Sequence, residues 1–211
     1  DSNVNGTGIN KESLFTITNS MFTNTESAEK PEYIKYIHVT THTGNNTFKI
    51  SEVSYTALPA GFNEQNSDGS YTLADFKNVE YKGFVSGTSS VTYSFETDGL
   101  KASFPGGWND YLTYKMPEQL SLADMKTITI NCNIQGNDRD YTGFYLVDSN
   151  GAKFYAKKDP YYSFANNKFT IDVAALIADG EISGNLVSIL IIGGGYKPTN
   201  TYSSITYTKN A

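Results

Sequence analysis

The residues best suited to chemistry are aromatic and amide side chains near turns. Trp108, the only tryptophan, follows Gly106 and Gly107 and precedes Asn109 and Asp110. Tryptophan is usually buried, but this turn favours a ring at a strand edge, partly exposed and beside polar groups. A pyranose has an apolar C–H face and a rim of hydroxyl groups, so an aromatic face beside amides and carboxylates suits it. These residues raise the hypothesis of glycan binding.

Strand-like alternation predicts which other side chains face outwards. In segments 110–116, 127–134 and 141–148, apolar residues recur at every second position. Cys132 lies on an apolar side, where a small core residue is expected rather than a reactive thiol. The opposite sides collect tyrosines and asparagines, and Tyr155 of segment 153–156 completes the candidate ligand-binding set with Trp108. The set is Trp108, Tyr111, Asn131, Asn133, Tyr141, Tyr145 and Tyr155.

Outward tyrosines and asparagines on neighbouring strands can form a binding platform. Rings stack on sugars at ~1 kcal/mol each, and amides bond to vicinal hydroxyl groups. The alternative is that these side chains are ordinary cross-strand pairs of a solvent-facing sheet. A second aromatic cluster, residues 159–164, either plugs one end of the fold or borders the binding cleft.

Catalytic residues are poorly represented. The only histidines are His38 and His42, and His38 alternates with apolar residues, as a structural strand histidine does. The sequence has no Gly-x-Ser-x-Gly elbow. The outward acids lie at turns, where aspartate is expected for local backbone reasons: Asp110, Glu118, Asp138 and Asp140. We therefore expect a chain that is not an enzyme.

No cofactor is expected, although a structural calcium ion is conceivable. Loop carboxylates that could ligate it are Asp138, Asp140 and Asp148, or Glu96 or Asp98. The spacing of an EF-hand is absent, and the local turn role is preferred.

Composition predicts the elements that position these residues. Of 211 residues, 16 are Tyr and 18 are Gly, and Thr, Ser and Asn abound, which is typical of strands joined by turns. Strand-like runs recur at short intervals from residue 80 onwards, and the one helix expected is short, at 172–178. This pattern predicts an all-β fold, an antiparallel β-sandwich of the jelly-roll type. Residues 73–76 suggest a helical turn within a loop.

Charge and hydropathy restrict the partners. The formal net charge is −6 and Arg139 is the only arginine, which excludes nucleic acid as a partner. No apolar run reaches the ~20 residues that a membrane-spanning helix needs, and no signal peptide is present at Asp1. One cysteine rules out a disulfide within the chain, which fits a bacterial secreted or cell-surface protein.

An internal similarity predicts the domain organisation. Strand-like segments near Phe15, Tyr33 and Tyr55 resemble those near Phe169, Leu186 and Tyr207, in the same order. Residues 1–57 are therefore interpreted as the last three strands of a preceding repeat, 58–77 as a linker or long loop, and 78–211 as a complete sandwich. This favours Asp1 as a cut in a longer chain. The first three strands would pack on the same sandwich or exchange with another copy.

From residue 91 to 173 the chain resembles the non-catalytic carbohydrate-binding modules of the β-jelly-roll type in secreted bacterial glycanases. The segments that carry the resemblance are 93–100, Gly106-Gly-Trp-Asn-Asp-Tyr111, Met116-Pro-Glu-Gln-Leu-Ser-Leu122, 144–151 and Phe169-Thr-Ile171. Such modules similarly place a Gly-Trp near the start of a strand and an Asp-x-Asn-Gly hairpin later.

The resemblance implies that Trp108 stacks on sugar and that Tyr111, Asn131, Asn133, Tyr141 and Tyr145 line a groove on one sheet. A single tryptophan departs from the family pattern and favours a tyrosine-based cleft for a soluble plant cell-wall polysaccharide: β-glucan, xyloglucan, mannan or xylan. The resemblance also implies a covalently attached glycoside hydrolase as the catalytic partner. The alternatives are a structural or adhesive sandwich of a bacterial surface protein and, less favoured, a jelly-roll hydrolase or lyase.

Overall fold

Alternating apolar and polar residues build two antiparallel sheets that face each other. The computed structural model describes residues 58–106, 109–134, 142–193 and 199–210. The chain divides into two units, Asp1–Thr56 and Ala57–Ala211, and the following concerns the described residues of the second. The predictions for residues 1–57, including the repeat and strand exchange, lie outside the described residues.

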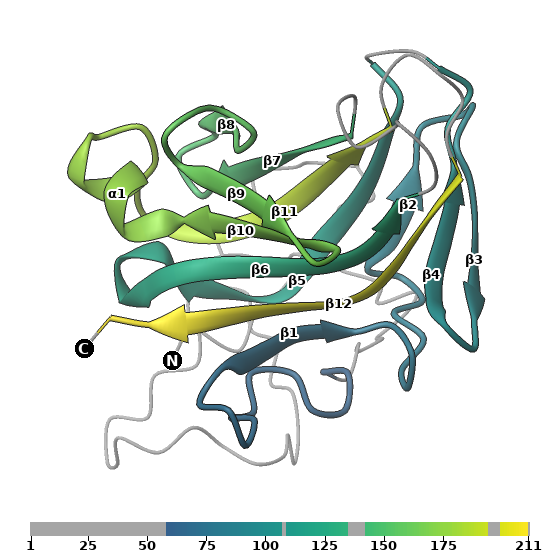
Figure 1. The fold of residues 1–211 in the computed structure, drawn as a ribbon, viewed down its shortest axis with the longest axis horizontal. Helices are drawn as coiled ribbons and strands as arrows, with labels where there is room; N and C mark the ends of the chain where they lie inside the picture. The colour runs from purple at the N-terminus through teal and green to yellow at the C-terminus, as the bar shows by residue number, and fades with distance from the viewer. Residues whose placement is uncertain (1–57, 107–108, 135–141, 194–198, 211) are drawn as a thin grey trace, which may run out of the picture. The chain divides into compact units, whose positions relative to one another are not determined.

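The larger sheet has seven strands within the described residues. Its order is β3-β4-β12-β6-β10-β9, and β1 also pairs with β12. Figure 1 shows the long strand β12 with β6 on one side and β1 and β4 on the other. The strands are β1 (Tyr71–Asp75), β3 (Thr92–Glu96), β4 (Gly99–Ser103), β6 (Met125–Ile134), β9 (Tyr162–Ala165), β10 (Lys168–Asp172) and β12 (Thr199–Lys209).

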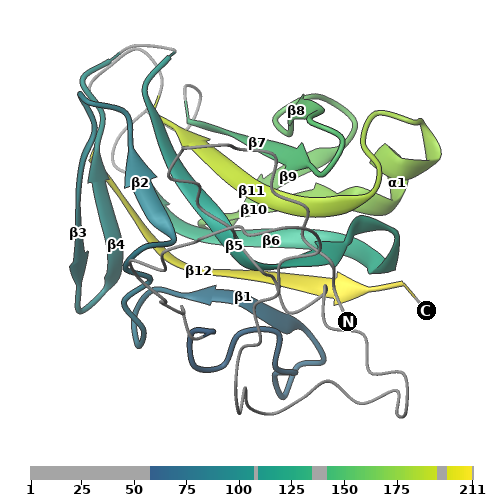
Figure 2. The same ribbon diagram turned by 180° about the vertical axis from the view of Figure 1, so that it is seen from behind.

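The smaller sheet has five strands within the same residues, in the order β2-β5-β11-β7-β8. Figure 2 shows it from behind. The strands are β2 (Val85–Gly87), β5 (Tyr111–Ser121), β7 (Gly143–Asp148), β8 (Lys153–Tyr155) and β11 (Asn185–Ile192). From β4 to β7, and again from β10 to β12, successive strands alternate between the two sheets, as in a jelly roll. The predicted all-β sandwich is therefore confirmed.

The core lies between the sheets and is rich in aromatic rings. Phe144 of β7 meets Phe169 of β10 edge to face at 4.9 Å between ring centroids. Phe76, Tyr81 and Tyr114 form a mutual edge-to-face cluster at 5.3 to 5.6 Å. Cys132 is buried, as predicted, and burial raises the pKa of its thiol to about 12.

The described part of the chain contains one α-helix, α1 (Val173–Ala178), and a 3₁₀ turn at Leu122–Asp124. The Asp172 carboxylate accepts a hydrogen bond from the Ala175 amide and caps α1, which confirms the helix expected at 172–178. In both ribbon views α1 lies at the end opposite the β3–β4 hairpin. Over these residues, no helix is long and apolar enough to cross a membrane.

Two segments expected to be irregular are strands. Residues 73–76 do not form a helical turn, because β1 pairs with β12 from Tyr71 to Asp75. The expected linker or loop at 58–77 therefore contributes a strand to the larger sheet. Residues 162–165, expected within an aromatic loop, form β9 beside β10.

Candidate functional site

The outer face of the smaller sheet gathers three of the predicted tyrosines. Tyr111 stands on β5, Tyr145 on β7 and Tyr155 on β8, each partly exposed and on the side away from the core. The Tyr111 and Tyr145 ring centroids lie 6.1 Å apart at 79°, and those of Tyr145 and Tyr155 lie 5.0 Å apart at 45°. β11 runs between β5 and β7, so the Tyr111 and Tyr145 rings approach each other across it.

A lysine joins this group. Lys153 and Tyr155 are two residues apart on β8 and share its outer face, whereas Phe154 between them is buried. The Lys153 ammonium lies 4.2 Å from the ring centroids of both Tyr111 and Tyr145. We call Tyr111, Tyr145, Lys153 and Tyr155 the tyrosine face.

Gly143 makes room for Tyr155. A Cβ atom on Gly143 would lie 2.5 Å from Cε2 and 2.6 Å from the hydroxyl of Tyr155, so the ring occupies the space that a side chain would need. Burial, with smaller contributions from neighbouring tyrosines, raises the pKa of Tyr155. Its hydroxyl group therefore stays protonated at neutral pH and can donate a hydrogen bond.

The two predicted asparagines lie elsewhere. Asn131 and Asn133 belong to β6, and β6 is a strand of the larger sheet. Both face outwards as alternation predicts, but the expectation that they line one sheet together with the tyrosines is wrong. The Asn131 amide donates to the Ser204 hydroxyl of β12 at 2.7 Å, which is a cross-strand role.

Two further candidates, Trp108 and Tyr141, lie outside the described residues. Their expected contact with a glycan stays a prediction. Asn109, next to Trp108, is exposed, and Tyr111 begins β5 two residues later.

The aromatic cluster at 159–164 supports the hypothesis of a plug. Tyr161 is buried, meets Phe154 edge to face at 5.7 Å and donates a hydrogen bond to Asp179 at 2.6 Å. That hydrogen bond is the main reason that the pKa of Tyr161 rises to about 12. On β9, Tyr162 and Phe164 pack against Phe169.

The acids considered for calcium are scattered or used locally. Asp138 and Asp140 lie outside the described residues, and among those described no three of His, Cys, Asp and Glu gather as a metal site. Asp148 is buried and accepts hydrogen bonds from the backbone amides of Asn150, Ala152 and Ser183 at 2.8 to 3.1 Å. It thereby ties the β7–β8 turn to the segment before β11.

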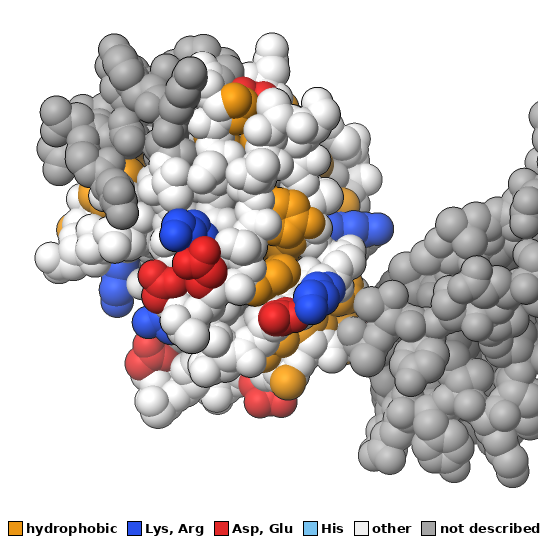
Figure 3. Space-filling model, turned by 90° about the vertical axis from the view of Figure 1, so that its right-hand side faces the viewer, with side chains coloured by type: hydrophobic (Ala, Val, Ile, Leu, Met, Phe, Trp, Pro, Cys, Tyr) orange, Lys and Arg blue, Asp and Glu red, His pale blue; other side chains and the backbone are white. Residues whose placement is uncertain are grey.

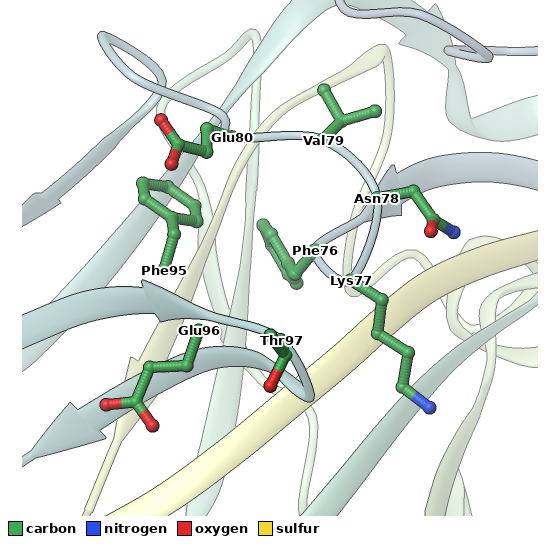
Figure 4. Close-up of a pocket in the computed structure, with 8 residues that line it drawn as sticks. All are labelled: Phe76, Lys77, Asn78, Val79, Glu80, Phe95, Glu96 and Thr97. Atoms are coloured by element: carbon green, nitrogen blue, oxygen red, sulfur yellow. The ribbon is translucent and has the colours of Figure 1, made fainter.

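A groove opens beside the β3–β4 hairpin. It has a volume of about 400 Å³ and lies between the loop at 76–80 and residues 95–97. Figure 4 shows Phe76 and Phe95 projecting into it while Lys77 and Asn78 point away. Figure 3 shows a strip of hydrophobic side chains between acidic and basic ones on this side of the molecule.

The groove is less suited to a sugar chain than the tyrosine face. Phe95 is partly exposed, but Phe76 is buried, so a single ring is available for stacking. The tyrosine face offers three rings together with hydroxyl and ammonium donors.

Sequence reasoning identified the tyrosines but missed Lys153 and Gly143 as parts of the site. Lys153 lies two residues before Tyr155, so alternation along β8 could have placed both on one face. The pairing of Tyr145 with Tyr155 depends on register, which sequence alone did not provide.

Comparisons with protein-family models and with curated proteins found no match. Among solved structures, carbohydrate-binding modules have a similar fold. A low-affinity xylan-binding module, CBM86 from the gut symbiont Roseburia intestinalis, is 12% identical with a TM-score of 0.39, over 60% of this chain and 94% of that one.

Two variants of a family 29 carbohydrate-binding module are also similar. One, in complex with cellulohexaose, is 10% identical with a TM-score of 0.46, and the other is 10% identical with a TM-score of 0.47. Each match covers 65% of this chain and 89% of that module. At these identities the similarity concerns the fold alone.

Proposed function

We propose that this chain binds a soluble plant cell-wall polysaccharide, without catalysis, on the tyrosine face. The observation that carries the proposal is the convergence of Tyr111, Tyr145 and Tyr155 from three strands onto one outer face, with rings 5.0 to 6.1 Å apart. Adjacent rings offer apolar surface for successive sugars, and their hydroxyl groups supply polar partners at the rim.

The expected affinity is weak. Stacking on each ring contributes ~1 kcal/mol beyond area burial, and hydrogen bonds to sugar hydroxyl groups replace bonds to water, so dissociation constants of roughly 10 µM to 1 mM follow. Such a module is useful when it is attached to an enzyme, because binding raises the local concentration of the enzyme at its substrate. We therefore propose an attached glycoside hydrolase and a secreted or cell-surface location.

The first test is affinity electrophoresis of the chain in gels that contain β-glucan, xyloglucan, glucomannan or xylan. We expect retardation in one or two of these gels, and Tyr145→Ala to reduce it at least fivefold, because Tyr145 contacts both other rings. The matched control is Tyr93→Ala, which removes a 40% exposed tyrosine from β3, a strand of the larger sheet.

Circular dichroism of each variant establishes that it is folded. Retardation that survives in folded Tyr145→Ala but disappears in Tyr93→Ala would move the site to the β3 side of the molecule. No retardation of the wild-type chain in any gel would contradict the proposal. Release of reducing ends, measured on the same polysaccharides, would identify a hydrolase instead.

A further inference from the structure

The Lys153 ammonium occupies the notch between two rings of the tyrosine face. It lies 4.2 Å from the centroids of both Tyr111 and Tyr145, and the two ring planes meet at 79°. An ammonium group over an aromatic face is attracted by the ring quadrupole, by ~0.5–1 kcal/mol at an exposed site. Lys153 makes no ion pair with any carboxylate among the described residues.

Lysines outnumber acids on the exposed positions of this sheet. On the partly or fully exposed positions of β2, β5, β11, β7 and β8, the charged side chains are Lys115, Lys153 and Glu118. The nearest buried acid, Asp148, points inwards and is satisfied by three backbone amides. The outer face of the larger sheet differs, because there Lys101 of β4 pairs with Glu96 of β3 at 3.3 Å.

An excess of lysines on this sheet is unexpected in a chain with a net charge of −6. Screening makes the two facts compatible, because charges more than about 8 Å apart interact weakly through water at physiological ionic strength. The net charge disfavours a dense polyanion. It does not oppose a ligand that brings one carboxylate to this face at intervals.

A ligand that stacks on the tyrosine face must either displace the Lys153 ammonium or bind to it. A neutral sugar that stacks on Tyr111 or Tyr145 displaces the cation from the ring and offers only hydroxyl oxygens in return. A uronic acid offers a carboxylate, which forms a charge-assisted hydrogen bond with the ammonium while the C–H face of the sugar rests on a ring. We infer that the tyrosine face selects polysaccharides that carry uronic acid residues, with Lys153 as the residue that binds the carboxylate.

This inference rests on the proposed function and names its ligand class. The probes are glucuronoxylan and the same polysaccharide after chemical reduction of its carboxyl groups, which removes the charge and keeps the backbone. Isothermal titration calorimetry in 20 mM salt should show that the chain binds the acidic form about three- to tenfold more tightly, as one partly exposed ion pair allows. The preference should shrink in 500 mM salt.

The matched variants are Lys153→Met, which keeps an apolar stem and removes the charge, and Lys115→Met, which removes the other lysine of the face. Lys153→Met should bind the two forms equally, and Lys115→Met should keep most of the preference. Equal or tighter binding of the reduced form by the wild-type chain would overturn the inference and leave the proposed function intact. Binding of neither form, nor of any neutral polysaccharide in the gels, would overturn both.

Discussion

Side chains in this fold differ in how many hydrogen bonds their polar atoms make within the protein. The tyrosine face consists of side chains that are partly or fully exposed. Asp148 is the opposite case, because it is 3% exposed and both carboxylate oxygens accept backbone hydrogen bonds. It holds the turn that leads into β8, which carries Lys153 and Tyr155.

The first prediction concerns Asp148→Ala. The substitution leaves the amides of Asn150, Ala152 and Ser183 without their acceptor in a largely buried place, so we expect a loss of about 3 kcal/mol in the free energy of unfolding. Urea unfolding followed by fluorescence measures it. The control is Asp172→Ala, which removes an exposed helix cap and should cost about 1 kcal/mol. Equal losses in the two variants would contradict a special role for Asp148.

At the scale of elements, the spacing of strands and the size of side chains decide where the rings lie. β7 brings Gly143 and Tyr145 to the same face, and the absence of a side chain on Gly143 lets the Tyr155 ring of β8 lie over it. Tyr155 is held in this position by packing, since its ring meets Tyr145 on one side and the backbone of β7 beneath.

Gly143→Ala tests this arrangement. The Cβ atom of the alanine would lie 2.5 Å from the Tyr155 ring, so the ring must move away. We therefore expect glycan binding to fall severalfold, whereas the midpoint of urea unfolding should change little. The expected change in stability is small because alanine costs less chain entropy than glycine in a strand, which offsets part of the clash. Added to Tyr155→Ala, the same substitution should have no further effect on binding. An equal loss in both backgrounds would show that Gly143 acts by another route.

The sequence predicted the faces of strands better than their partners. Alternation is a local property, because successive side chains of a strand point to opposite faces. It was enough to predict that Leu112, Tyr114 and Phe144 point inwards and that Tyr145 points outwards. Which sheet a strand joins depends on contacts far along the chain. For this reason Asn131 was placed beside the tyrosines, although β6 pairs with β12 and β10 in the other sheet.

Short strands were missed for a related reason. β1 has five residues and is bent by a bulge between Thr72 and Ala74, so its pattern of burial departs from strict alternation. β9 has four residues, and its aromatic side chains were equally compatible with a loop. Both are strands because a long neighbour, β12 or β10, supplies the hydrogen-bond partners.

At the scale of the whole molecule, buried tyrosines connect the two sheets. Tyr114 of β5 is fully buried, and its hydroxyl group donates to the Leu73 carbonyl of β1 at 2.5 Å, which links the smaller sheet to the larger one. Tyr202 of β12 is also fully buried and meets Phe144 of β7 edge to face. Burial raises the pKa of both hydroxyl groups well above the ordinary value of 10.

These tyrosines make the stability of the fold sensitive to alkaline pH. Above about pH 10 the unfolded chain releases the phenolic protons while the folded chain keeps them, so the unfolded state binds fewer protons and the free energy of unfolding falls as pH rises. The contribution is fully present below pH 10. Each fully protected tyrosine reduces the free energy of unfolding by up to about 1.4 kcal/mol per pH unit above that point.

Tyr114→Phe isolates one such contribution. At pH 7 the variant should lose about 1 kcal/mol, because the Leu73 carbonyl loses its donor. Between pH 10 and 11.5 its free energy of unfolding should fall less steeply than that of the wild-type chain, by about 1 kcal/mol per pH unit, since one protected phenol is gone. Urea unfolding at half-unit steps from pH 8 to 11.5 measures both curves, and the two chains share every lysine, so deprotonation of lysines cancels in the difference. Parallel curves over this range would mean that Tyr114 ionises as readily in the folded chain as in the unfolded one, and that its burial does not protect it from solvent.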